Sequence, residues 1–232
     1  MGNSQRLWYG FAITAVIFAV ANIIGVHTHL HSHFFINAFA VDTVMIVLSI
    51  GVILALKRNL HFALSWPKLR YLPKPLLIGM AVSLVFNILI AIVTRHTGVS
   101  KETASLLNGM TPLQVFVFVF IYASIAEELL FRGFLLNLLS PLKGKGVACL
   151  KRKLSLPVIL SALVFGLAHL ILITTGAGAA ILIMLVISAT CLGLVAGYYQ
   201  EKHNNHSYAI IVHMAGNLIP FLGILLMSAS HA

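Results

Sequence analysis

Two adjacent acidic residues lie inside an apolar stretch of the sequence, Ile125-Ala-Glu-Glu-Leu-Leu-Phe-Arg-Gly-Phe134. On an α-helix, Glu128 and Arg132 are four residues apart and share one face, so they can form an ion pair. Glu127 lies about 100° further round the helix and is poorly placed to share this arginine. The spacing therefore leaves Glu127 as the free carboxylate and makes it a candidate general base.

Polar groups with helical spacing occur in two other apolar stretches. Phe165-Gly-Leu-Ala-His169 ends in a histidine, and in His213-Met-Ala-Gly-Asn217 the histidine and the asparagine share one helix face. An ionisable group inside a membrane costs at least about 2.5–3.5 kcal/mol on insertion scales, so such residues are functional candidates by default. In the alternative, purely structural interpretation, they form an ion pair and interhelical hydrogen bonds that hold the helices together.

The elements that carry these residues are predicted to be membrane-spanning helices. The chain of 232 residues is 60% hydrophobic and 9% charged, with a mean hydropathy of +1.02, whereas soluble domains average about 25% charged residues. We therefore expect a single all-α membrane domain, a polytopic helix bundle, with three accessory spans in 1–111 and a catalytic core in 112–228. The seven apolar runs long enough to span a bilayer are roughly 7–26, 34–56, 75–93, 112–140, 156–173, 177–199 and 206–228.

Most basic residues fall at one side of the predicted spans. With seven spans, twelve of the fifteen Lys and Arg residues face this side, two (Arg95 and Lys101) face the other, and Arg132 lies inside the membrane. Such a bias marks the cytoplasm, so we expect a multi-pass protein of the cell membrane with a cytoplasmic N-terminus and Glu127 near the cytoplasmic side. Anionic lipid heads account for the net charge of +10, and the expected partner is the lipid bilayer, with no nucleic acid.

The polar motifs together resemble those of one protein family, the CAAX-protease and bacteriocin-processing family of intramembrane endopeptidases, also called Abi. The similarity covers about residues 112–220. Each motif alone is weak, but the three occur in order on successive predicted membrane helices. The motifs are E-E-x-x-x-R at Glu127-Glu128…Arg132, F-x-x-x-H at Phe165…His169 and H-x-x-x-N at His213…Asn217.

The resemblance implies hydrolysis of a peptide bond in a peptide or membrane-protein substrate, near the cytoplasmic side. By this resemblance Glu127 is the general base that activates water, and His169 holds that water or moves its proton. His213 and Asn217 would donate to the developing oxyanion, a role that suits their shared helix face, and the predicted ion pair would orient the site. The family has many bacterial members, some linked to bacteriocin processing or immunity, and we expect a bacterial source.

Metal binding is an alternative that the residue types leave open. One glutamate and two histidines form an open zinc set, but the family is read as a glutamate-type protease, so no cofactor is expected. The loop from His27 to His33 contains four alternating histidines, which can bind metals weakly, but the predicted topology places it outside, far from the motifs. His203 and His206, at the entrance to the last span, are interpreted as interfacial.

Two other classes of function fit the same residues. A proton-coupled transporter could use Glu127, His169 and His213 as a relay, although the sequence shows no internal repeat. A protein of the same fold could also act by binding alone, for example as an immunity factor against a peptide. The Glu127→Gln variant separates these readings, because a protease loses its function and a binding protein keeps it.

Overall fold

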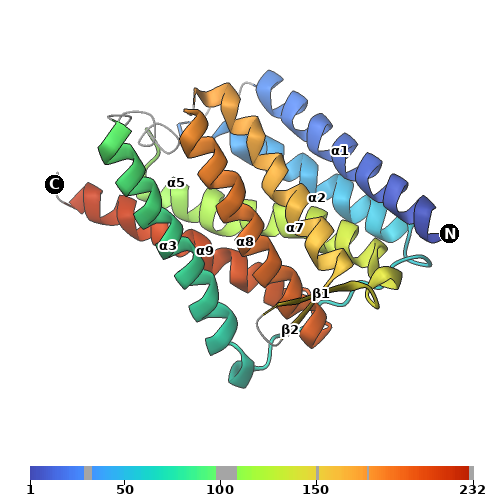
Figure 1. Ribbon diagram of the computed structural model, residues 1–232. Coiled ribbons are helices and arrows are strands. Elements are labelled where there is room, and N and C mark those ends of the chain that lie inside the picture. Colours follow the sequence, from blue (N-terminus) through green and yellow to red (C-terminus); the bar gives the residue numbers. More distant parts are fainter. Residues whose placement is uncertain (29–32, 98–108, 150–151, 177, 230–232) are drawn as a thin grey trace.

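Seven helices of the computed structural model are long and apolar enough to cross a membrane, within the described residues 1–28, 33–97, 109–149, 152–176 and 178–229. The prediction of an all-α, seven-span bundle is confirmed (Figure 1). Except for the fourth, the spans comprise α1 (Asn3–His27), α2 (Asn37–Ala55), η1 (Leu69–Tyr71) with α3 (Pro73–Thr97), α7 (Leu156–Ala168) with η6 (His169–Thr175), α8 (Ala179–His203) and α9 (Ser207–Ala229).

The fourth span changes its helical pitch several times. It begins with Pro112 directly after the N-cap Thr111, whose hydroxyl accepts a hydrogen bond from the Gln114 backbone N–H at 3.3 Å. Wide π-helical turns, which are rare and recur at functional sites, flank the α-helical turn that carries both glutamates. The segments are α5 (Pro112–Gln114), η3 (Val115–Ala123, π), α6 (Ser124–Glu128) and η4 (Leu129–Leu136, π).

The fourth span lies in the middle of the bundle. Every residue of η4 is buried, because α1, α2, α7 and α8 pack around it, while α9 packs against η3 and α6. Around this centre, α7 pairs with α8, and α3 packs against both α8 and α9 (Figure 1). The residues of the first motif are therefore enclosed by helices from both halves of the chain.

The outer helices bury a narrow stripe of residues and expose apolar side chains. In α1 the buried positions Gly10, Thr14, Ile17, Ala21 and Gly25 recur every three or four residues, which is the spacing of one helix face. Large apolar side chains on the opposite faces are exposed, Val16 and Leu54 among them. An apolar exterior of this kind is what contact with lipid requires.

A small β-hairpin, which the sequence analysis did not predict, follows the fourth span. After the short η5 (Ser140–Leu142), β1 (Gly146–Cys149) pairs in antiparallel register with β2 (Arg152–Ser155). The hairpin and the N-terminus lie toward the same end of the bundle, and α9 ends at the opposite end (Figure 1). This arrangement agrees with an odd number of spans; the assignment of the hairpin end to the cytoplasm stays a prediction.

Candidate active site

Glu128 is the centre of a buried polar cluster. Arg132 Nη1 donates to Glu128 Oε1 at 2.9 Å, and both residues are fully buried, so the predicted ion pair is present. His213 Nδ1, from α9, lies 2.8 Å from the same carboxylate oxygen. Since the paired carboxylate accepts, His213 carries a proton on Nδ1 and donates it to Glu128. The second motif glutamate thus joins two helices that are far apart in the sequence.

The Arg132 guanidinium occupies a tight slot between α7 and α8. On one side it lies over the Phe165 ring, 4.3 Å from the ring centroid, where the negative face of the ring attracts a cation. On the other side is Gly193, and any Cβ at this position would clash with the guanidinium. The absence of a side chain at Gly193 therefore makes room for a buried charge.

Glu127 points to a different environment from its neighbour. Its side chain is 24% exposed, and its Oε2 lies 3.7 Å from His213 Nε2. Within the described part of the chain it has no Arg or Lys at ion-pair distance, as the helix spacing predicted. His213 consequently lies between the two glutamates, bonded to one through Nδ1 and facing the other with Nε2.

His169 and His213 both line a cavity of about 390 Å³. His169 is the first residue of η6, where the helix tightens, and its Nδ1–H donates to the Phe165 carbonyl at 3.0 Å. This bond leaves the Nε2 lone pair of His169 free to accept. Asn217 lines the same cavity. Glu127 is not part of its lining, but its Oε2 lies 3.7 Å from Nε2 of His213, which is. The second and third motifs thus meet at this cavity, and the first motif contacts its wall through His213.

Asn217 uses both amide hydrogens within the protein. Its Nδ2 donates to the Val119 carbonyl at 3.2 Å and to the Ser124 hydroxyl at 3.1 Å. Ser124 is fully buried and donates in turn to the Phe120 carbonyl at 2.8 Å. An oxyanion-donor role for Asn217 therefore requires one of these bonds to be exchanged when a substrate binds. Ser124 was missed by the sequence analysis, although a lone hydroxyl three residues before Glu127 is a recognisable signal.

Spans predicted to be accessory also contribute polar groups to the site. Asp42 of α2 is 4% exposed, and its Oδ2 lacks a hydrogen-bond partner among the described residues. It is close enough to Glu127 for the two carboxyl groups to interact electrostatically. Ser83 and Asn87 of α3, joined by a 3.2 Å hydrogen bond, line the cavity. A lone acid within an apolar helix was the available signal for Asp42, but nothing local links it to Glu127.

His206 is buried, and its interpretation as an interfacial residue is wrong. The residue is 1% exposed, residues 205–209 around it are all buried, and its ring packs against Phe62. Its Nδ1–H donates to Gln200 Oε1 at 2.8 Å, and Gln200 Nε2 donates to the Arg132 carbonyl at 3.0 Å. Burial lowers the pKa of His206 to about 4. This chain of polar contacts supports the backbone of the residue that pairs with Glu128.

The donor groups of the site do not form a metal-binding set. Among the residues that the structure describes, no three His, Cys, Asp or Glu side chains are placed to hold a metal ion. The expectation that the protein needs no cofactor stays a prediction. Of the histidine-rich loop, residues 29–32 lie outside the described residues, so its predicted metal affinity is not tested.

The part of the chain that carries the site matches a known protein family. Residues 109–219 match the family described as type II CAAX prenyl endopeptidase, Rce1-like, and they contain all three motifs. This part of the chain is similar to the CAAX-protease family, as the motifs indicated. Comparison with curated proteins and with solved structures gives no match. The family match supports a CAAX-type intramembrane endopeptidase, carried by a multi-pass membrane protein.

Proposed function

We propose that the protein hydrolyses a peptide bond of a membrane-associated or peptide substrate, with Glu127 as the general base for the attacking water. The observation that carries this proposal is the position of His213, which donates to Glu128 at 2.8 Å and faces Glu127 at 3.7 Å on a cavity wall. One glutamate thus orients the imidazole, and the other stays free to take a proton.

The division between the glutamates follows from their surroundings. Glu128 Oε1 already accepts from Arg132 and His213, and the whole side chain is closed off from solvent. A general base must come within hydrogen-bond reach of the water that it activates. Glu127, with part of its side chain exposed and without an arginine partner, meets this requirement.

His213 is the group best placed to respond to charge. The Glu128 carboxylate at Nδ1 fixes the ring orientation and stabilises a positive ring, as the carboxylate does in carboxylate–histidine catalytic pairs. With a second proton on Nε2, His213 balances the charge of Glu127 and can donate to the oxyanion that forms on the scissile carbonyl. Arg132 balances the charge of Glu128. The net charge of the two glutamates, Arg132 and the protonated His213 is then zero.

The proton in this scheme returns to the product. Glu127 removes a proton from water while the water oxygen bonds to the carbonyl carbon, and the free Nε2 of His169 accepts the second water hydrogen as a hydrogen bond. When the carbon–nitrogen bond of the tetrahedral intermediate breaks, protonated Glu127 gives the proton to the leaving nitrogen. The step needs no metal, and Asn217 assists the oxyanion once a substrate displaces one of its present bonds.

We place the reaction near the cytoplasmic side of a bacterial cell membrane. Glu127 lies 15 residues after the start of its span and 9 before its end, and the end is the one closer to the hairpin along the chain. The positive-inside bias predicts that this end is cytoplasmic.

The test compares the peptides of cells that carry the wild-type protein with those of cells that carry Glu127→Gln. Glu201→Gln is the matched control, since Glu201 accepts from the Ser155 hydroxyl and is not among the residues that line the cavity. We expect specific cleavage products with the wild type and the control, and their loss with Glu127→Gln. Products that persist in Glu127→Gln would refute the base assignment. Loss of wild-type activity on metal chelation would refute the metal-free mechanism.

A further inference from the structure

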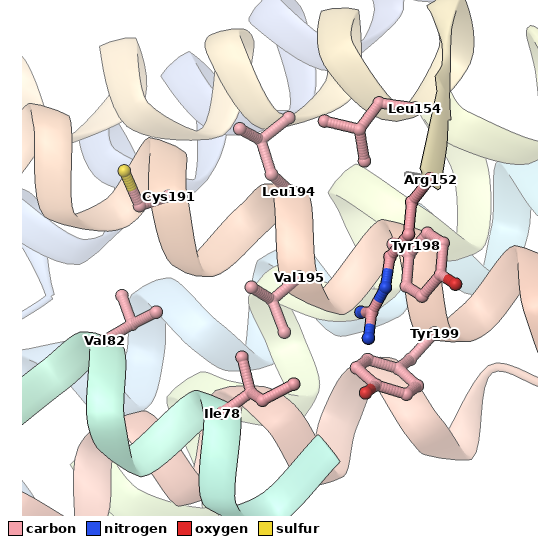
Figure 2. A pocket seen from close by; sticks show the side chains of 9 residues that line it. All are labelled: Ile78, Val82, Arg152, Leu154, Cys191, Leu194, Val195, Tyr198 and Tyr199. Carbon is pink, nitrogen blue, oxygen red and sulfur yellow. The ribbon is translucent and has the colours of Figure 1, made fainter. Parts of the chain in front are cut away.

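A second cavity, separate from the catalytic one, lies between α3 and α8 beside the hairpin (Figure 2). Its volume is about 490 Å³, and its walls are apolar side chains such as Ile78 and Val82 of α3 and Val195 of α8. Val82 also lines the catalytic cavity, so the two hollows are neighbours along the same pair of helices. The proposed chemistry uses nothing in this second cavity.

Polar groups gather at one end of this cavity. Arg152 reaches from β2 over the Tyr198 ring, with 5.2 Å between the guanidinium carbon and the ring centroid. Figure 2 shows the guanidinium between the two tyrosine rings, on the cavity side. Tyr199 is 2% exposed, and its buried hydroxyl lacks a hydrogen-bond partner among the described residues. A buried hydroxyl without a partner is costly, so this end of the cavity is suited to a ligand that accepts hydrogen bonds.

Tyr199 also forms a wall of an adjoining pocket of about 370 Å³, which is rich in cations. Arg70, Lys74 and Lys202 line this pocket. In the described ranges of the chain, neither these three residues nor Arg152 has a carboxylate within ion-pair distance. Four cationic side chains therefore line the two pockets that share Tyr199, and none of them is paired with a carboxylate in the described part of the chain.

We infer that the α3–α8 cleft binds an anionic phospholipid, with an acyl chain in the apolar cavity and the phosphate among the four cations and the Tyr199 hydroxyl. The acyl chain covers the apolar walls of the cavity, which a free phosphate leaves uncovered. The phosphate supplies the negative charge that balances the four cations. The position agrees with the source of the ligand, because the positive-inside bias places this end at the cytoplasmic leaflet, where anionic lipids gather.

Native mass spectrometry of the purified full-length protein in detergent tests this inference. With phosphatidylglycerol and phosphatidylcholine of the same acyl chains, we expect several-fold higher occupancy by the anionic lipid. Arg152→Gln combined with Lys202→Gln should remove this preference. Lys153→Gln is the matched control, since neighbouring strand residues point to opposite faces and Lys153 Nζ donates to the Gly144 carbonyl; it should leave the preference intact.

A second variant tests the apolar half of the site. Val195→Phe fills the cavity without changing any charge, and we expect it to lower the occupancy of phosphatidylglycerol. Inorganic phosphate should not compete with the lipid at equal concentration. Equal binding of the two lipids, an unchanged preference in the double variant, full occupancy in Val195→Phe, or displacement by phosphate alone would each overturn the proposal. Tighter binding of an uncharged prenyl alcohol would overturn it too, in favour of a purely apolar ligand.

Discussion

In the polar cluster around Glu128, charged side chains have partners of opposite charge, whereas the cations at the basic end of the α3–α8 cleft have none among the residues that the structure describes. In the first, Glu128 contacts Arg132 and His213 in a space closed to solvent. In the second, four cations lie near an unpaired hydroxyl, with no carboxylate at ion-pair distance in the described part of the chain. The difference suggests that the first region is built to hold its own side chains in place, and the second to hold something from outside.

The same contrast appears on a smaller scale within α6. Glu128 is enclosed and bonded, whereas Glu127, one residue earlier, is partly exposed and, within the described part of the chain, has His213 but no Arg or Lys within ion-pair distance. Neutralising the first should therefore change stability, and neutralising the second should change activity. Substitutions at each of the two acids test this division.

Glu127→Gln should lower the rate of peptide cleavage by about 10²–10⁴-fold, the usual contribution of a general base. The fold should remain intact, and the melting temperature in detergent should stay unchanged or rise slightly, because a partly desolvated charge is removed. Cleavage of an identified substrate and thermal melting measure the two effects on the same sample. A large loss of melting temperature would show that Glu127 is the structural acid.

Glu128→Gln should destabilise the fold by about 3–5 kcal/mol, the cost of breaking a buried ion pair, because Arg132 loses its countercharge. Thermal melting and yield of folded protein measure this loss. Replacing both partners, Glu128→Gln with Arg132→Met, should restore much of the stability but not all of the activity. If Glu128→Gln is stable and inactive while Glu127→Gln melts far lower, the two roles are reversed.

His206 contacts Gln200, which in turn bonds to the backbone of Arg132. The stability of the fold should depend on pH through the titration of this histidine. Its pKa is about 4 in the fold against 6.5 ordinarily, so between these values the unfolded chain binds more protons than the native one. Stability should thus fall as pH decreases from about 6.5 to about 4, by at most about 3.5 kcal/mol at 1.4 kcal/mol per pKa unit. Melting temperatures of the wild type and His206→Gln across this range should converge at low pH; parallel curves would contradict the assignment.

Gly193→Ala should cost about 1–3 kcal/mol, the usual penalty for overpacking, because the new methyl group meets the Arg132 guanidinium. Gly51→Ala on α2 is the matched control, since a Cβ there meets nothing within 4 Å. We expect the control to melt at or above the wild-type temperature. Equal melting of both variants would mean that the guanidinium slot is loose.

Sequence patterns predicted the features that depend on neighbours along the chain. Run length predicted the seven spans, and the four-residue spacing predicted the Glu128–Arg132 pair, because helix geometry fixes both. The bond between His213 and Glu128 joins residues 85 positions apart, and no local period reports such a contact. The same reason explains why Asp42, the lining of the cavity by α3 and the burial of His206 were not foreseen. The roles predicted for Glu127, His169 and Asn217 await the experiments above.

The position of His213 on the last span has a consequence for the synthesis and membrane insertion of the protein. A chain that leaves the ribosome from its N-terminus inserts both glutamates and Arg132 long before α9 is made. Until the seventh span joins the bundle, Glu128 has its arginine but not its imidazole, and the cavity lacks the wall that α9 supplies. The nascent protein therefore holds an incomplete set of the proposed catalytic groups. The proposed peptide hydrolysis can begin only after α9 has packed against the other spans.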